Sequence, residues 1–222
     1  MAKYTRAPHV EDHILTLMHE DMKDPSRSAQ IPSVSGLIKC LTKYYYDNNS
    51  NAAKTAVPSR RLLMLFATGL GLESQLLRGR QFNQVLQVDG IWGHYDHLQD
   101  GDLLFELKST RISSKRPPED LPYDKQIKSY FKMTGARKLY LTVLHLMGGY
   151  QPPFPDLVVW DVEFDDKEVE DHWNWMKERR DVYAAAVEAG VAPKQFTYND
   201  EYECEECPYK AICDLREEGL LP

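Results

Sequence analysis

Apolar residues recur with a helical period through the first third of the chain. The opening stretch to about Ser28 is polar, and we predict a helix followed by a loose turn. Ser33 or Ser35 is the expected N-cap of a second helix, because a serine hydroxyl accepts a hydrogen bond from a free backbone amide. One face of that helix would carry Leu37, Cys40, Leu41 and Tyr44. A third helix is expected from Pro58-Ser59 to about Leu77.

After Gly79 the period changes from helical to alternating. Three strands are predicted over residues 85–89, 91–98 and 103–109, with Asp100-Gly101 as a strong turn signal between the last two. Beyond them the pattern predicts a helix at 120–134, strands at 139–146 and 157–164, and a long amphipathic helix at 165–189. The tail after Val191 has little periodicity. This order of elements indicates an α/β fold with a mixed central sheet flanked by helices.

Length and composition fit one globular domain. The 222 residues allow a single domain with a substantial core and small appendages. No apolar run approaches the ~20 residues of a membrane span, and the N-terminus lacks the apolar segment of a signal peptide. We therefore expect a cytoplasmic protein, in which cysteines stay as thiols or bind metal. The chain has no Gly-x4-Gly-Lys-Ser/Thr loop, so we expect no fused helicase or ATPase.

The net charge of −7 conceals an uneven distribution. Residues 107–138 hold nine Lys or Arg and three Asp or Glu, whereas residues 161–222 hold seven and eighteen. A local basic surface favours phosphate binding even on an acidic protein, because charges are screened beyond about 10 Å. The alternative is that both runs are ordinary solvated faces. The candidates for nucleic-acid binding are Arg111, Lys115, Lys125, Lys128 and Lys132.

Two acidic residues and a lysine occupy neighbouring strands of the predicted sheet. Glu106 and Lys108 share one face of their strand, because alternate residues of a strand point the same way. The turn decides whether Asp96 joins them. A two-residue Asp-Gly loop would pair Asp96 with Phe105, whereas a three-residue loop over 100–102 would pair it with Glu106. A shared site therefore requires the three-residue turn or a bend in the Asp96 strand.

Asp96, Glu106 and Lys108 suit metal-assisted hydrolysis of a phosphodiester. Mg²⁺ or Mn²⁺ binds carboxylates together with phosphate oxygens, and it lowers the pKa of a bound water. A neighbouring lysine can orient that water or stabilise the negative charge that develops. Glu106 and Lys108 also interrupt an otherwise apolar strand, and buried polar residues need a partner or a function. The alternative is an ordinary hairpin with a surface Glu and Lys.

The same three residues, with Gly93 three positions before Asp96, resemble motifs II and III of the PD-(D/E)xK nucleases. Gln126-x-x-x-Tyr130 resembles the Gln-x-x-x-Tyr motif of the RecB-like branch of that superfamily. Residues four apart share one face of a helix, so both side chains can reach the same site. The resemblance implies a restriction-endonuclease-like core, in which Gln126 and Tyr130 orient the catalytic lysine and contact DNA.

One expected metal ligand departs from the RecB-like pattern. The branch carries a histidine in a Gly-x-x-x-His context on a helix before the hairpin, and the matching position here is Glu73. We interpret Glu73 as the replacement ligand, with an exposed helix residue as the alternative. His94 and His97 are spare candidates. The metal ligands implied by the resemblance are therefore Glu73, Asp96, Glu106 and the main-chain carbonyl of Leu107.

The four cysteines form one pattern, Cys40 followed by Cys204-x2-Cys207-x5-Cys213. Three close thiolates and a distant one can complete a four-thiolate site, which an iron–sulfur cluster or a structural zinc ion would satisfy. One cysteine before a RecB-like core and three after it resemble the iron–sulfur exonucleases, such as the AddB nuclease domain and the CRISPR-associated adaptation nucleases. That resemblance implies a structural [4Fe–4S] cluster that ties the ends of the chain together.

The resemblance implies a single nuclease domain over residues 1–222. Its core would span 58–189, and residues 33–50 and 191–222 would form a helical cap that bears the cluster. The expected activity is Mg²⁺- or Mn²⁺-dependent exonuclease cleavage of single-stranded DNA or DNA ends. The expected role is the trimming of prespacer ends in CRISPR spacer acquisition, with integrase proteins as partners, or DNA repair and recombination. The alternative is a non-catalytic DNA-binding or complex-stabilising subunit, and the sequence leaves open whether the chain forms a homo-oligomer.

Overall fold

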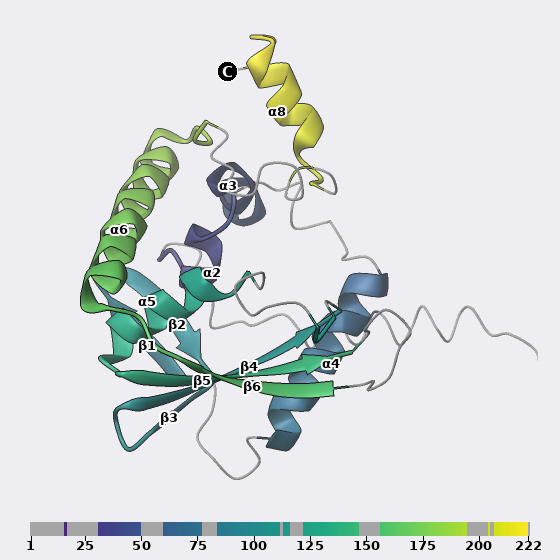
Figure 1. Cartoon of the computed structure of the whole chain (residues 1–222). Helices are drawn as coiled ribbons and strands as arrows, with labels where there is room; N and C mark the ends of the chain where they lie inside the picture. The colour runs from purple at the N-terminus through teal and green to yellow at the C-terminus, as the bar shows by residue number, and fades with distance from the viewer. Residues whose placement is uncertain are drawn as a thin grey trace, which may run out of the picture.

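A computed structural model describes Thr16 and residues 31–49, 60–76, 84–111, 113–115, 122–146, 156–194, 204 and 207–221. The strands lie at the base of the molecule, α6 rises along one side, and α2, α3 and α8 lie above the sheet (Figure 1). The helices are α2 (Val34–Leu37), α3 (Leu41–Asn49), α4 (Arg60–Leu76), α5 (Asp124–Thr134), α6 (Asp166–Ala189) and α8 (Lys210–Glu217). The strands are β1 (Gln84–Val88), β2 (Ile91–Tyr95), β3 (His97–Gln99), β4 (Leu103–Thr110), β5 (Lys138–His145) and β6 (Asp156–Val162).

The sheet is mixed, as the order of predicted elements indicated. Its strand order is β3-β4-β5-β6, with β4 and β5 parallel and the outer pairs antiparallel. β1 and β2 form a separate antiparallel hairpin. The parallel pair needs a crossover, which α5 supplies. The expected α/β fold with a mixed sheet and flanking helices is therefore confirmed.

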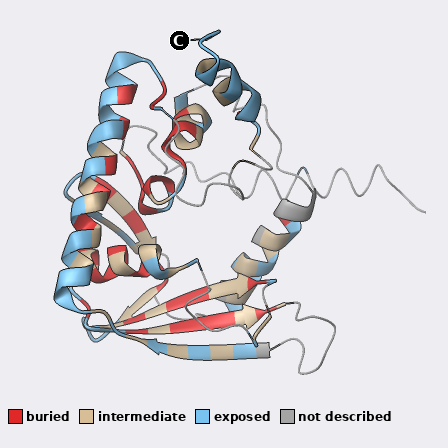
Figure 2. Ribbon diagram, turned by 45° about the horizontal axis from the view of Figure 1, so that its top comes forward, coloured by how far each residue is buried: buried red, intermediate tan, exposed pale blue. Residues whose placement is uncertain are grey.

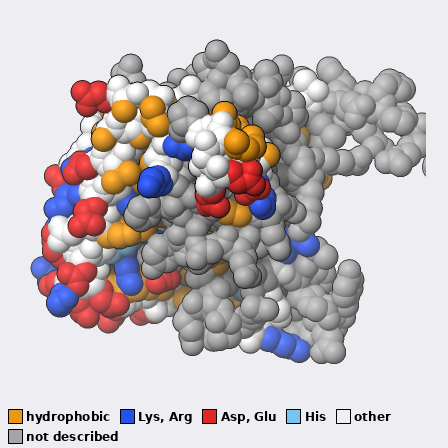
Figure 3. Space-filling view, turned by 90° about the horizontal axis from the view of Figure 1, so that it is seen from above, with side chains coloured by type: hydrophobic (Ala, Val, Ile, Leu, Met, Phe, Trp, Pro, Cys, Tyr) orange, Lys and Arg blue, Asp and Glu red, His pale blue; other side chains and the backbone are white. Residues whose placement is uncertain are grey.

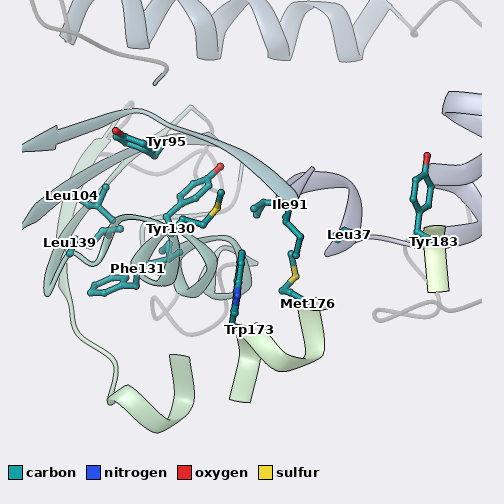
Figure 4. Packing of buried hydrophobic residues seen from close by; sticks show 14 of the residues in the cluster. Leu37, Ile91, Tyr95, Leu104, Tyr130, Phe131, Leu139, Trp173, Met176 and Tyr183 are labelled. Atoms are coloured by element: carbon teal, nitrogen blue, oxygen red, sulfur yellow. The ribbon is translucent and has the colours of Figure 1, made fainter. Parts of the chain in front are cut away.

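The core lies between one face of the sheet and the helices α5 and α6. Leu104 of β4 stands beside Leu139 of β5, and the next positions on that face of β5 are also buried and apolar. From the helical side, Trp173 and Met176 of α6 project toward α5 and the start of β2 (Figure 4). Buried positions gather where these elements face one another, and the outer surface of α6 is exposed (Figure 2). The apolar positions that alternate along the strands and those that recur along the helices thus pack in one core.

The single helix expected from Ser33 onward is wrong, because the chain breaks between α2 and α3. Ser33 is the N-cap, as predicted, and its hydroxyl accepts a hydrogen bond from the amide of Gly36. Arg179 of α6 then donates to the carbonyls of Leu37 and Lys39 and is only 4% exposed. Carbonyls bound by a guanidinium are not available to continue the helical ladder, so the buried arginine stabilises the break.

The tail also differs from the expectation that it lacks periodic structure. Residues 210–217 form the helix α8, two turns that carry Cys213. This helix has only 8 residues, which is shorter than the window over which helical periodicity is recognised in a sequence. The helix predicted before Ser28 lies, apart from Thr16, outside the described residues.

The long helix α6 has two different sides. Asp165 caps its N-terminus by accepting a hydrogen bond from the amide of Glu168, at 2.7 Å. Its outward side carries both acidic and basic side chains, which are interspersed at the left of Figure 3. Among the helices that the structure describes, none combines the length and the apolar character that crossing a lipid bilayer requires.

The contact between α5 and α6 includes a partly buried histidine. His172 of α6 lies with its Nε2 2.9 Å from the hydroxyl of Ser129 on α5. Burial, and after it the nearby ammonium of Lys128, lowers the pKa of His172 to about 4. The folded protein therefore holds this side chain neutral at a pH where the unfolded chain protonates it.

We predict that the free energy of unfolding falls as the pH falls from about 6.5 to about 4, through His172. The folded pKa lies below the unfolded one, so the stabilisation is complete above the unfolded pKa and is lost on acidification. The expected loss is about 1–3 kcal/mol. Denaturant unfolding at several pH values should show a steeper dependence for the wild type than for His172→Gln. Parallel curves for the two proteins would contradict the prediction.

Candidate functional site

The hairpin between β3 and β4 has the three-residue turn that a shared site requires. Gln99 pairs with Leu103, and Asp102 donates its amide to the carbonyl of Gln99 at 3.3 Å. Asp100 and Gly101 have φ values of 52° and 84°, in the left-handed region where Gly and Asp are tolerated. Gln99 and Leu103 enclose three turn residues, so the predicted three-residue turn is confirmed. Extended by one residue beyond His97 and Phe105, the same register places Asp96 opposite Glu106.

Asp96 lies at a bend that separates β2 from β3. The predicted strand over residues 91–98 is therefore two short strands. The Asp96 carboxylate accepts a hydrogen bond from the amide of Leu107, with Oδ2 and N 2.6 Å apart. The side chain thus binds the backbone of β4 beyond the last paired residue of β3, and only 7% of Asp96 is exposed. The sequence required either a three-residue turn or a bend in the Asp96 strand, and the structure contains both.

Glu106 and Lys108 point to the buried face of β4, where they form an ion pair. Their neighbours on β5 are Leu141 and Val143, so Glu106 is only 2% exposed. Burial alone would lower the pKa of Lys108, but the carboxylates of Glu106 and Asp96 outweigh it and raise that pKa above its usual range. Lys108 is therefore a fixed positive charge and not a proton acceptor.

Gln126 and Tyr130 reach the same site from α5. The Gln126 amide donates to the Tyr130 hydroxyl at 2.7 Å, which the predicted spacing of four residues on one helix face allows. Burial, and after it the charge of Glu106, raises the pKa of Tyr130, which therefore stays protonated. Gly93 explains how the helix comes so close: a Cβ there would lie 3.2 Å from the Tyr130 ring and 3.0 Å from the sulfur of Met133. The Gly-x-x-Asp spacing thus has a packing reason in this chain.

These side chains line one cavity of about 240 Å³, which we call the Asp96 cavity. The five sequence-predicted residues Asp96, Glu106, Lys108, Gln126 and Tyr130 all line it. Among its described lining residues, Lys108 is the one Lys or Arg and faces two carboxylates, which leaves an excess of negative charge. Burial raises the pKa of Asp96 despite the opposing effects of Lys108 and the Leu107 amide. A divalent cation fits this donor set, because it would compensate the remaining charge.

The remaining candidate ligands differ in how they reach the cavity. Leu107 lies between Glu106 and Lys108 in β4, and its amide binds Asp96. The side chain of Glu73 lies outside the described residues, although Leu70 of the same helix α4 lines the cavity. His94 lines the cavity, whereas the His97 ring packs against Phe105, with centroids 5.9 Å apart.

The lysines of α5 that the sequence suggested for DNA binding lie against α6. Lys128 pairs with Glu168 at 3.5 Å, and Lys132 pairs with Glu170. Lys125 lies over the ring of Trp175, 5.7 Å from its centroid. Arg111 follows β4 and Lys115 lies farther along the chain, both exposed. None of these five basic residues is among the described residues that line the Asp96 cavity.

Among the lining residues that carry a hydroxyl group or an aromatic ring, Ser33, Ser35 and Trp92 were not predicted from the sequence. The sequence pattern assigns the two serines to helix capping alone. Trp92 precedes Gly93, and a tryptophan beside a glycine in a short strand is the sequence signal of close packing that could have identified it. The indole Nε1 donates to the carbonyl of Ile31 at 2.7 Å, which fixes the side chain at the cavity wall.

The four cysteines line a second, smaller pocket between α3 and α8. None of the four forms a disulfide. Burial, and after it the three other cysteines, raises the pKa of Cys213. Beside this pocket the Tyr209 hydroxyl donates to Asp47 of α3 at 3.0 Å. Over the described part of the chain, no group of three or more His, Cys, Asp or Glu side chains converges closely enough to hold a metal ion as it stands.

Comparison with known proteins defines the fold and little beyond it. No protein-family model matches the sequence, and no curated protein is significantly similar to it. The structure is similar to the crystal structure of SSO0001, with a TM-score of 0.58 and 19% identity over 92% of this chain and 96% of that one. This similarity shows a shared fold over nearly the whole length.

Two exonucleases are more distantly similar. A phage-related exonuclease from Haemophilus somnus 129PT has a TM-score of 0.46 and 14% identity, over 72% of this chain and 96% of that one. LHK-Exo of Laribacter hongkongensis in complex with dAMP has a TM-score of 0.47 and 13% identity, over 72% and 91%.

The excess negative charge in the Asp96 cavity generates a prediction about stability. Asp96→Asn keeps an oxygen that can accept from the Leu107 amide but removes one buried charge. In the absence of divalent metal, the variant should be more stable than the wild type by about 1 kcal/mol. Added Mn²⁺ should raise the melting temperature of the wild type and leave that of the variant nearly unchanged.

Differential scanning calorimetry with and without Mn²⁺ measures both effects. Asp102→Asn, at an exposed position of the turn, is the matched control and should respond to Mn²⁺ like the wild type. An equal response of Asp96→Asn and Asp102→Asn to Mn²⁺ would contradict the assignment of Asp96 as a ligand.

Proposed function

We propose that this protein is a metal-dependent DNA nuclease whose active site is the Asp96 cavity. One observation supports the proposal above the others: the buried carboxylates of Asp96 and Glu106 line one cavity with the partly buried Lys108, which leaves an excess of negative charge. Buried carboxylates that share a site destabilise a protein unless they have a cation or a function. Two carboxylates beside a lysine are suited to a phosphodiester, which brings its own negative charge to the site.

The residues would divide the chemistry between them. Asp96 and Glu106 would hold Mg²⁺ or Mn²⁺, with the Leu107 carbonyl and Glu73 as further proposed ligands. The bound metal supplies a Lewis acid that polarises the phosphodiester and lowers the pKa of a water. The Leu107 amide fixes the orientation of the Asp96 carboxylate.

Lys108 remains protonated, so its role is to donate hydrogen bonds to the attacking water or to the phosphate oxygens. The hydrogen-bonded pair of Gln126 and Tyr130 bounds the cavity on the α5 side and positions the lysine and the substrate. The Lys108 ammonium also lies 5.9 Å from the ring centroid of Tyr123, which helps to hold it in place.

The substrate we propose is single-stranded DNA or a DNA end, cut by an exonuclease mechanism. A confined cavity of about 240 Å³ suits one phosphodiester of a flexible strand better than a continuous duplex. The resemblance of the sequence to adaptation nucleases supports a role in trimming prespacer ends for CRISPR spacer acquisition, with integrase proteins as partners. DNA repair or recombination is the second role that we consider.

We further propose that the cysteines hold a [4Fe–4S] cluster. The donor set fits, because four cysteines from two distant parts of the chain line one pocket and form no disulfide. Closure of a loop from Cys40 to Cys213 would stabilise the fold through the chain entropy of the unfolded state. The metal would act as a staple between α3 and α8.

The test of the nuclease proposal is hydrolysis of end-labelled single-stranded DNA by anaerobically purified protein with Mg²⁺ or Mn²⁺. Lys108→Ala should lower the rate by about 10²–10³-fold, because it removes a preorganised donor from the site. Lys177→Ala on α6 is the control and should cleave normally. Failure of the folded, metal-loaded wild type to cleave any DNA would favour a non-catalytic DNA-binding or complex-stabilising subunit, the alternative that the missing histidine at position 73 keeps open.

The test of the cluster is the metal content of the purified protein. We expect four iron and four sulfide per chain and a brown colour, all lost in Cys213→Ala together with a lower melting temperature. Cys40→Ser should behave in the same way because it removes the distant ligand. One zinc and no iron per chain would contradict the proposal and indicate a zinc staple.

A further inference from the structure

The Asp96 cavity adjoins a second cavity beside α2 and α3. This second cavity has a volume of about 290 Å³ and extends to Lys39, Lys43 and Asn48. Ser33, Ser35 and Trp92 line both cavities. The three shared residues place the two cavities side by side, and we call the second one the Trp92 groove. Its far end reaches Cys40, which also lines the cysteine pocket.

The balance of acidic and basic side chains differs between the two cavities. The Asp96 cavity holds two carboxylates and one lysine, whereas the Trp92 groove holds Lys39 and Lys43 against a single acid, Asp47. Lys43 and Asp47 form an exposed ion pair one helical turn apart, which is weak and can be exchanged for a phosphate. The remaining polar lining is made of hydroxyl and amide groups. A DNA strand would therefore meet positive charge next to the site where its scissile phosphate requires a metal.

Trp92 stands at the junction of the two cavities in a fixed orientation. Its backbone amide donates to the carbonyl of Pro32 at 3.0 Å, and its indole Nε1 donates to Ile31. The His94 ring contacts it edge-on, with centroids 4.8 Å apart and planes at 66°. An indole that is held in place and only partly buried offers a face on which a DNA base can stack with little loss of side-chain entropy.

The alternative strand path along α5 holds three lysines, but α6 supplies a partner to each of them. Lys128 and Lys132 are paired with carboxylates of α6, and Lys125 lies over an aromatic ring of the same helix. DNA binding there would have to replace these contacts while it approached α6, whose sequence holds seven acidic and four basic residues. The Trp92 groove adjoins the Asp96 cavity along three shared residues.

We propose that the Trp92 groove binds the single DNA strand that continues from the scissile phosphate. Trp92 stacks on a base next to the cleavage site, and Lys39 and Lys43 bind phosphates farther along the strand. The inference rests on the proposed nuclease function and extends it by assigning the strand path and a preference for single strands. Stacking on a base face at Trp92 requires an unpaired base, so duplex DNA binds more weakly.

Fluorescence anisotropy with labelled oligothymidine tests the path, with Ca²⁺ in place of Mg²⁺ to limit hydrolysis. The double variant Lys39→Ala/Lys43→Ala should bind several-fold more weakly, and the slope of log K against log salt should fall by about 1.4 for two lost phosphate contacts. Lys167→Ala/Lys177→Ala, on α6, is the charge-matched control and should bind like the wild type. The proposal is overturned if the loss appears in Lys125→Ala/Lys132→Ala instead, or if the groove variant binds normally.

Two substitutions of Trp92 separate stacking from packing. Trp92→Phe and Trp92→Leu both lose the hydrogen bond to Ile31, but only Phe keeps an aromatic face. We expect Trp92→Leu to bind single strands at least about fivefold more weakly than Trp92→Phe at equal melting temperatures. Equal affinities of the two variants would exclude a stacking role.

A small diester distinguishes failure of the groove from failure of the active site. Bis(p-nitrophenyl) phosphate occupies the Asp96 cavity alone, so Lys39→Ala/Lys43→Ala should hydrolyse it at the wild-type rate while losing activity on the long strand. Equal losses on both substrates would contradict the groove assignment. If the wild type binds single strands through Lys39 and Lys43 but hydrolyses neither substrate, the groove stands and the nuclease proposal fails.

Discussion

The hydrogen bond from the Leu107 amide to the Asp96 carboxylate is the contact on which the candidate site depends. It joins a bend in the β2–β3 segment to the strand that carries Glu106 and Lys108. The three-residue turn at 100–102 is what makes this contact available. A turn that was one residue shorter would place Asp96 on the opposite face, because side chains alternate along a strand. The local geometry of a hairpin therefore determines whether the chain has a metal-binding cavity.

The charged side chains of the cavity keep their positions because apolar residues pack around them. Glu106 lies among Leu141 and other buried residues of the core, where an uncompensated carboxylate destabilises the fold. The ion pair with Lys108 offsets part of that cost, and a cation would offset the remainder. The sheet, α5 and α6 provide a rigid apolar frame in which these few polar groups keep fixed positions. Such preorganisation is what electrostatic catalysis requires.

Short-range sequence patterns predicted most of the frame and the centre of the site. Alternation and helical periodicity located β4, α5, β5, β6 and α6, and the chemistry of the motif selected the correct hairpin register. The break between α2 and α3 could not be predicted, because it depends on Arg179, 140 residues away from Lys39. The α5 lysines illustrate the same limit: their ion partners lie on α6, so their availability for DNA is a tertiary property. The proposed base-stacking role of Trp92 depends on its position in the wall of two cavities, which is also a tertiary property.

The most direct measurement is anomalous X-ray diffraction from crystals soaked in Mn²⁺, at the manganese absorption edge. The charge distribution in the cavity predicts a strong peak between the carboxylates of Asp96 and Glu106, with Lys108 directed toward the open part of the cavity. It also predicts no such peak in crystals of Asp96→Asn grown and soaked in the same way. An Asp96 cavity that remains without manganese at saturating Mn²⁺, with the Glu106–Lys108 ion pair intact, would contradict the assignment of a metal-dependent active site.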